Sequence, residues 1–242
     1  MENRNLLYGL IALGISLGFG SCVIGRGLGE IRRPEEAITV TGSAKRPITS
    51  DFVVWRASVG MQSPSITTAA AELRSESNKV RQFLRANGVA DSMLTVKPVE
   101  TFAIPEVVDN GRETGRIVAY RLTQQFEVRS ANVQALTALS QKAADLMSEG
   151  VALSSQPPEY LYTKLGDLRI SLIEEATRDA KLRAEAIAKS TGNSIGSVRQ
   201  ARIGVFQITP RFSTEIADYG INDVTAIDKD VTAVVHVTFA LR

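Results

Sequence analysis

The sequence opens with an uninterrupted apolar segment and then changes to the mixed periodicity of a folded domain. Residues 6–25 contain no charged side chain. A helix of that length, rising about 1.5 Å per residue, matches the hydrocarbon core of a bilayer. Beyond Arg32, apolar residues recur with periods of two or of about 3.6. We therefore expect a membrane anchor and hinge over residues 1–33 and one folded domain over residues 34–242.

The apolar segment is best interpreted as an uncleaved signal anchor. It continues past Gly18 and Gly20 to Ile24 before Arg26 ends it, which is longer than the core of a cleaved signal peptide. Two alternatives stay open: conventional cleavage, and lipidation at Cys22, which follows a small-residue stretch. Basic residues lie on both sides of the segment, so the charge rule alone does not fix the topology.

Two glycines within this segment have the spacing of a helix-packing motif. Gly14 and Gly18 form a G-x-x-x-G pair, and such pairs let two membrane helices approach closely. Glycine is also common in membrane helices that do not pair. Gly14 and Gly18 are therefore candidates for helix packing between two copies of the chain.

The first part of the domain predicts a split β-α-β-β-α-β lobe. Alternating residues indicate strands, and apolar residues three or four apart indicate helices. An Asp109-Asn110-Gly111 turn signal predicts a hairpin between the third and fourth strands. Strands are expected over residues 38–45, 52–61, 94–104 and 117–129, and a last one begins at residue 151. Helices are expected over residues 66–84 and 133–146.

The second part predicts a long helix, roughly 165–191, followed by two strands, 198–208 and 231–241. The whole domain is thus expected to be α+β. The segment between those strands, 209–229, is too long for a tight turn, and such loops are usually functional or disordered. We interpret it as a packing or subunit-contact loop, with Phe212, Tyr219 and Ile221 as contact candidates; disorder is the alternative.

The charge balance and the residue types of the chain exclude several kinds of functional site and identify none. The chain has 28 basic and 26 acidic residues, so no strong field attracts nucleic acid. His236 is the only histidine and Cys22 the only cysteine, which leaves no histidine-bearing metal site of the usual kind. His236 falls on the polar side of an alternating strand without an evident nucleophile and acid beside it. We predict no catalytic residue, cofactor or metal.

The long helix and its exit resemble the SIMPL-domain proteins of bacterial envelopes. Alanines recur four apart from Ala176 to Ala188, Gly192 ends the helix and Gly196 enters a strand. Weaker similarity extends over about 38–241, and Trp55 with the Gly-Arg-Gly-Leu at 25–28 resembles the membrane-anchored branch.

The resemblance implies a cellular location and a mode of assembly, and it implies little about chemical activity. Members of the family are periplasmic, secreted or membrane-tethered, have no assigned enzymatic activity, and in some cases form ring-like or channel-like homo-oligomers. We therefore expect a single-pass inner-membrane protein whose main domain lies in the periplasm or otherwise outside the cytoplasm, and whose partners are the bilayer, through 6–25, and copies of itself. A tethered module that binds another envelope protein or a small ligand, linked to stress, is the alternative; an unrecognised enzyme is a third.

Overall fold

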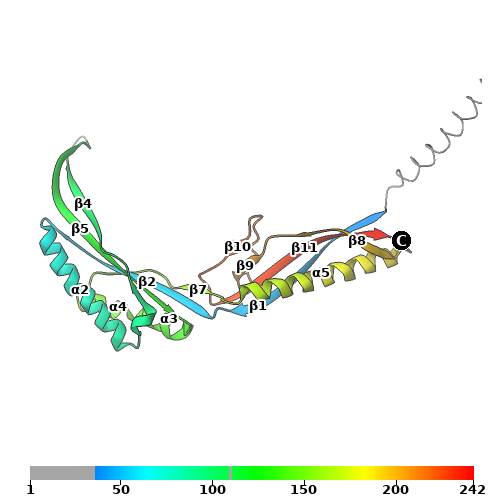
Figure 1. Cartoon of the computed structure of the whole chain (residues 1–242), viewed down its shortest axis with the longest axis horizontal. Helices are drawn as coiled ribbons and strands as arrows, with labels where there is room; N and C mark the ends of the chain where they lie inside the picture. Colours follow the sequence, from blue (N-terminus) through cyan, green and yellow to red (C-terminus); the bar gives the residue numbers. More distant parts are fainter. Residues whose placement is uncertain (1–35, 109–110) are drawn as a thin grey trace, which may run out of the picture. The chain divides into compact units, whose positions relative to one another are not determined.

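The computed structural model of the protein describes residues 36–108 and 111–242 (Figure 1). These residues fall into two compact units. One contains the residues up to Gly42 together with Ala180–Arg202 and His236–Arg242, and the other contains Ser43–Asp179 and Ile203–Val235. The loop, the ion-pair network and the hollow discussed below lie in the second, larger unit, and His236 lies in the smaller one.

One sheet, wholly within the larger unit, is built on two long antiparallel strands, β2 (Phe52–Ser63) and β5 (Glu113–Ser130). β2 is paired along almost its whole length, from Val53 opposite Ser130 to Ser63 opposite Tyr120. The far side of β5 pairs with β3 and β4, and the far side of β2 with β6 and β7. These shorter strands are β3 (Leu94–Val96), β4 (Glu100–Val107), β6 (Leu153–Ser155) and β7 (Glu159–Leu161).

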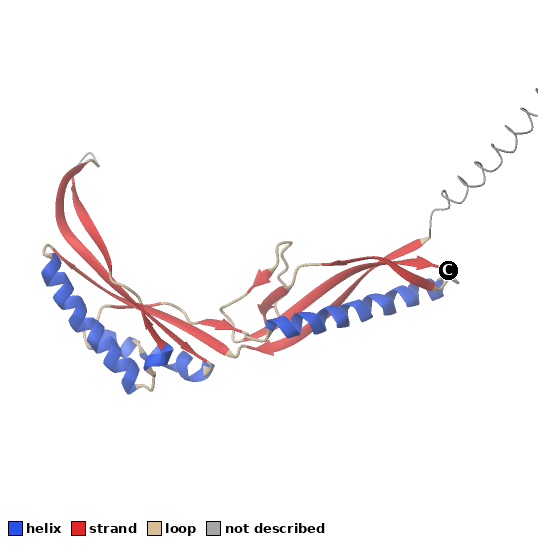
Figure 2. Cartoon of the chain, viewed as in Figure 1, coloured by secondary structure: helices blue, strands red, loops and turns tan. Residues whose placement is uncertain are grey.

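Three helices cover one face of this sheet: α2 (Ile66–Ala86), α3 (Val133–Lys142) and α4 (Ala144–Ser148) (Figure 2). A short 3₁₀ turn, η1 (Asp91–Met93), precedes β3. The Ser65 hydroxyl accepts the amide hydrogen bond of Thr68 and so caps α2. Alternate residues of β2 point into the core between sheet and helices, where Trp55 and Phe126 are almost fully buried. The opposite, helix-free face carries the other members of the alternation, which in β2 are Phe52 and Val54 followed by the polar residues Arg56 and Ser58.

A second sheet has the order β1 (Ala37–Thr49), β11 (Asp228–Leu241), β9 (Gln207–Pro210) and β10 (Ile221–Asn222), with β8 (Ile195–Ile203) also paired to β11. The helix α5 (Leu165–Ser190) runs along this sheet (Figure 1). In the larger unit, Leu168 and Leu172 of α5 pack against Ile48, Ile208 and Val231. In the smaller unit, Ala180, Ala184 and Ala188 of the same helix are buried.

The α+β class and the hairpin of β4 and β5 are confirmed, although Asp109 and Asn110 lie outside the described residues. Four features differ from expectation. The first predicted strand, β1, pairs with β11 in the second sheet instead of joining the lobe. The predicted strand 94–104 is divided into β3 and β4, the predicted strand 198–208 into β8 and β9, and the predicted helix 133–146 into α3 and α4. Local periodicity specifies neither the partner of a strand nor the point at which an element is interrupted.

Candidate functional site

The predicted membrane segment lies outside the described residues. Gly14, Gly18, Cys22 and the rest of 6–25 belong to that part of the chain. Within residues 36–108 and 111–242, no helix is long and apolar enough to cross a bilayer. The candidates that the structure places are therefore those of the 209–229 segment.

The 209–229 segment is an ordered excursion between β9 and β11. Its return path forms β10, whose Ile221 and Asn222 pair in parallel with Gln207 and Ile208 of β9. The Asp223 amide donates to the Ile208 carbonyl at 2.9 Å, and the Gln207 side chain donates to the Ala217 carbonyl at 2.7 Å. The segment is thus ordered and contains a short strand of its own, and its role in subunit contact stays a prediction.

Three large apolar side chains on the outer part of the loop face solvent. Phe212 is 83% exposed, Ile216 84% and Tyr219 89%. Ile221, the third predicted contact residue, instead lies in β10 and is only partly exposed. Ile216 is not among the contact residues predicted from the sequence, although its position midway between Phe212 and Tyr219 is a signal for it. We call Phe212, Ile216 and Tyr219 the loop-tip residues.

Phe212 has an unusual backbone. Its φ is +66°, the one positive value at a non-glycine residue among those described, and an aromatic residue there is strained. Its amide donates to Asp230 Oδ2 at 3.1 Å, and Lys45 pairs with the same oxygen at 2.8 Å. The hydrogen bond from Lys45 holds the pKa of Asp230 below its ordinary value. The Arg211 guanidinium lies 5.3 Å from the centroid of the Phe212 ring. The strain is therefore maintained by a charged anchor beneath the loop.

Gly220 makes the turn that brings the loop back. Its φ is +85°, and a Cβ at this position would come within 2.9 Å of the Phe206 carbonyl oxygen. Both conditions require glycine. The close approach places Tyr219 directly before a rigid turn, so the backbone that presents this side chain is fixed.

The base of the loop is held by a buried lysine. Lys229 is 2% exposed, and its Nζ donates to the carbonyl oxygens of Tyr160 at 2.6 Å and Asp223 at 2.5 Å. The Asp223 carboxylate lies 3.7 Å away. Burial lowers the pKa of Lys229, and the Asp223 charge opposes this effect. A cavity of about 260 Å³ lies beside it, with Phe52 and Tyr162 in its wall. Because the ammonium is occupied by three oxygens, its role is to tie the loop to β7.

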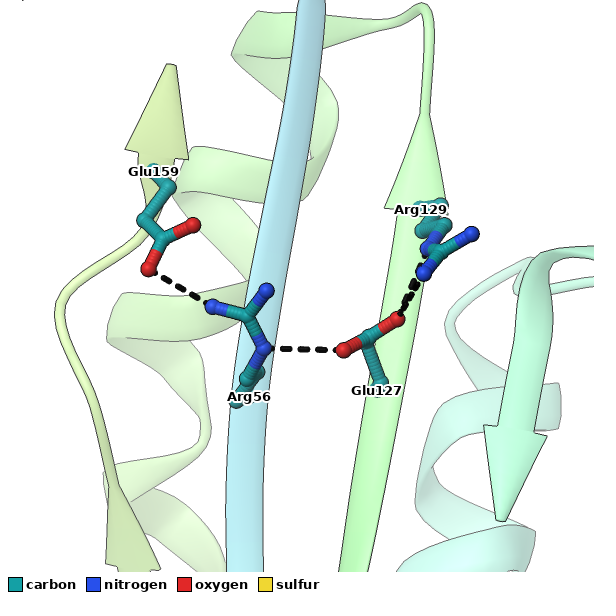
Figure 3. A network of polar contacts seen from close by, with 4 residues as sticks. All are labelled: Arg56, Glu127, Arg129 and Glu159. Carbon is teal, nitrogen blue, oxygen red and sulfur yellow. Dashed lines mark hydrogen bonds and ion pairs between the residues drawn. The ribbon is translucent and has the colours of Figure 1, made fainter. Parts of the chain in front are cut away.

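The helix-free face of the first sheet carries an ion-pair network (Figure 3). Arg56 Nε donates to Glu127 Oε2 at 2.8 Å, and its Nη1 donates to Glu159 Oε1 at 2.6 Å. Arg129 Nε donates to Glu127 Oε1 at 2.7 Å. Glu127 is only 3% exposed, and the hydrogen bond from Arg56 lowers its pKa more than burial raises it. A carboxylate ionised and bonded at both oxygens is poorly suited to proton transfer.

His236 lies on the polar side of β11, as the alternation predicts. Its Nδ1 is 2.9 Å from Thr41 Oγ1, and the neighbouring Thr39 and Thr238 hydroxyls are 2.9 Å apart. Its partner is thus Thr41, a residue of the neighbouring strand β1. In the described part of the chain, no three His, Cys, Asp or Glu residues are grouped as they would be around a metal ion.

A profile of one protein family matches almost the entire described chain. It is the family "SIMPL: Protein of unknown function (DUF541)", and the match covers residues 38–239. The chain belongs to the SIMPL family. The family expected from Ala176–Ala188, Gly192 and Gly196 is therefore confirmed, and the SIMPL match includes both β1 and β11. No curated protein matches the chain.

Solved structures with partial similarity to this SIMPL protein share little sequence with it. An uncharacterized conserved protein from Listeria innocua is 11% identical over 82% of this chain and 92% of its own, with a TM-score of 0.24. A de novo designed protein, Foldit4, is 10% identical over 43% of this chain and 93% of its own, with a TM-score of 0.26. An amidase of the hydantoinase/carbamoylase family from Burkholderia multivorans is 13% identical over 50% of this chain but only 28% of its own, with a TM-score of 0.23.

Proposed function

We propose that this SIMPL protein is a non-enzymatic envelope protein, anchored in the inner membrane through residues 6–25, that assembles with copies of itself through the loop-tip residues. The observation that carries the proposal is the exposure of Phe212, Ile216 and Tyr219, each more than four-fifths exposed on one ordered loop. Apolar side chains grouped in this way typically mark an interaction surface. The domain would then lie outside the cytoplasm, as a scaffold of ring-like or channel-like form.

The loop has the properties of a preorganised contact. Its base is fixed by Lys229, its return by Gly220, and its tip by the amide of Phe212 on Asp230. A rigid loop loses less conformational entropy when a partner packs on it than a flexible one. Burying a side chain of this size contributes about 1.5–3 kcal/mol, so several such contacts around a closed ring would make a stable assembly.

The proposed ring-like or channel-like form requires the loop tip of one copy to contact a different surface of the next copy. A contact between a tip and a different surface of the next copy generates a ring when the rotation closes. Membrane anchors would add to this by confining the copies to one plane, where Gly14 and Gly18 offer close helix packing.

The test is the mass of the full-length protein in mild detergent, measured by light scattering and corrected for bound detergent. We expect a defined multiple of the 26.2 kDa chain. Phe212→Asn removes the ring while keeping a residue that tolerates a left-handed backbone, and we expect it to reduce the mass. Ile170→Gln is the matched control, because Ile170 is an apolar side chain outside the loop that is 62% exposed on α5. A monomeric wild type, or an assembly unchanged by Phe212→Asn, would refute the proposal.

Removing the whole 209–229 segment is a poorer test than the point substitution. The segment includes Asp223, which binds Lys229, and Ile227, whose carbonyl accepts the Ser50 amide at 2.8 Å. Its deletion would break the base of the loop as well as the tip. Phe212→Asn changes only the surface that is proposed to make the contact.

A further inference from the structure

A second feature of the larger unit, distant in sequence from the loop, is a row of basic side chains on one flank of α2. Arg74, Asn78, Arg81 and Arg85 follow one another at intervals of four, three and four residues, so they lie along one side of the helix. The acidic residues of the middle of the helix lie on the other flank, where Glu76 pairs with Lys79 at 2.9 Å. The helix is therefore divided lengthwise by charge.

This flank borders a hollow. The row forms one wall of a cavity of about 540 Å³, and Val99, Leu122 and Gln124 contribute to the opposite wall. That volume is within the range of small-molecule sites. The buried Ser77 hydroxyl donates to Gln124 Oε1 at 3.3 Å, and the Gln124 amide donates to the Lys97 carbonyl at 2.8 Å. The floor of the hollow is thus a fixed polar bridge between α2 and β5.

The basic groups at the hollow are only partly neutralised. The side chains of Arg74, Asn78 and Arg81 form no hydrogen bond or ion pair with any residue that the structure describes. The guanidinium group of Arg85 is neutralised in part by Asp91, whose carboxylate it contacts at 3.1–3.2 Å. Glu100, which follows Val99, is not among the residues that line the hollow. Two guanidinium groups and one amide are left available toward the same concave space.

We propose that this hollow is a binding site for a small ligand that carries two oxyanion groups about 10 Å apart. The spacing follows from the seven residues between Arg74 and Arg81, at about 1.5 Å of helix rise each. A guanidinium binds a carboxylate or a phosphate through two parallel hydrogen bonds, and the Asn78 amide can serve either group. Val99 and Leu122 provide an apolar surface for the part of the ligand between the acidic groups. The site goes beyond self-assembly and involves none of the loop-tip residues.

Calorimetric titration of the full-length protein at low ionic strength tests the proposal. A hexaglutamate peptide and a linear inorganic pentaphosphate, whose terminal phosphates can lie about 10 Å apart, are the two probes, with a hexaglutamine peptide as the uncharged control. We expect one of the acidic probes to bind with one site per chain, and which one binds distinguishes carboxylate from phosphate ligands. If neither acidic probe binds, or if the uncharged peptide binds equally well, the proposal is overturned.

Substitutions then locate the binding. Arg74→Gln with Arg81→Gln should weaken binding by about tenfold or more, since both charge-assisted contacts are lost. Arg178→Gln with Lys189→Gln is the matched control, because it removes the same charge from the exposed surface of α5. Asn78→Asp leaves both arginines in place but adds a negative charge to the wall, and it should also weaken binding. Equal losses in the control pair would show non-specific attraction and overturn the assignment.

Discussion

Removing Arg56 should destabilise the protein more than any other substitution of an ion-pairing residue on the helix-free face. Arg56 bridges two carboxylates, Glu127 on β5 and Glu159 on β7, and so joins three strands (Figure 3). Glu127 is the critical partner because it is 3% exposed. The substitution Arg56→Met keeps the aliphatic stem but leaves a buried carboxylate with Arg129 as its remaining partner.

The magnitude follows from this burial. Breaking a buried ion pair by removing one partner typically costs 3–5 kcal/mol, and we expect a cost of about 3 kcal/mol because Arg129 still neutralises Glu127. For a chain of this size, that loss lowers the melting temperature by about 6–12 °C. Thermal unfolding followed by circular dichroism measures it. The double variant Arg56→Met with Glu127→Met should recover part of the loss, because no buried charge is then left unpaired.

The same pair gives a pH prediction with a definite sign. The pKa of Glu127 is lower in the folded protein than its ordinary value of 4.5, chiefly because of the hydrogen bond from Arg56. The unfolded chain therefore takes up a proton first as the pH falls, and stability is lost below about pH 4.5. Glu127→Gln should reduce this acid sensitivity. An Arg56→Met variant within about 1 kcal/mol of wild type, or an unchanged acid profile in Glu127→Gln, would refute the argument.

Three further substitutions test other parts of the structure. Ala184→Leu should lower the free energy of unfolding by about 1–3 kcal/mol, because it overpacks a fully buried helix face. Ala186→Leu, on the exposed side of the same helix, should lower it little. Equal melting temperatures for the two variants would reject the placement of α5. Gly220→Ala should lower the stability of the turn by about 1–3 kcal/mol, because an alanine there has a strained positive φ and its Cβ approaches the Phe206 carbonyl. Proteolysis within 209–229 should then be faster. Unchanged proteolysis would argue against the turn. Lys229→Met should lower the urea midpoint, because buried oxygens lose their donor, and a midpoint equal to that of wild type would contradict the tie to β7.

The helices were the most predictable elements. α2 has five buried residues at helical spacing, a serine cap and an Asn87-Gly88 exit, and all of these signals are local. The alanine row of α5 likewise predicted a face packed on a sheet, and Ala180 and Ala184 are fully buried. Ile187, an apolar residue directly before Ala188, is nevertheless 47% exposed, so the buried face of this helix does not include every apolar position.

Strand partnership was not predictable from the sequence. β1 and β2 are separated only by Ser50 and Asp51 and both alternate, so they read as neighbours. Instead, the Ser50 amide bonds to the Ile227 carbonyl, and Asp51 accepts two hydrogen bonds from Thr163. These contacts turn the chain from one sheet to the other. A period of two identifies a strand and its faces but contains no information about a partner nearly 200 residues away.

The candidate sites likewise depend on pairings between strands that the sequence does not specify. The network of Arg56 and Glu127 depends on the register of β2 against β5, in which these two residues lie directly opposite each other, and an isolated charge in a strand gives no sign of it. The row of Arg74, Asn78 and Arg81 was visible in the sequence as a helical spacing of polar residues, but its significance depends on the hollow beside it. The opposite wall of that hollow comes from Val99, which precedes β4, and from Leu122 and Gln124 of β5, far along the chain.

The backbone of Phe212 is the strongest reason to regard the loop tip as functional. A non-glycine residue in the left-handed region costs about 1–3 kcal/mol, and glycine or asparagine would adopt the same conformation more easily. The aromatic ring recovers none of this cost by burial, because it is 83% exposed. Its one described ring contact is with Arg211, and an exposed cation–π contact contributes only about 0.5–1 kcal/mol. Stability of the isolated chain therefore gives no reason for phenylalanine at this position, whereas the proposed burial of the ring against a second copy would give one.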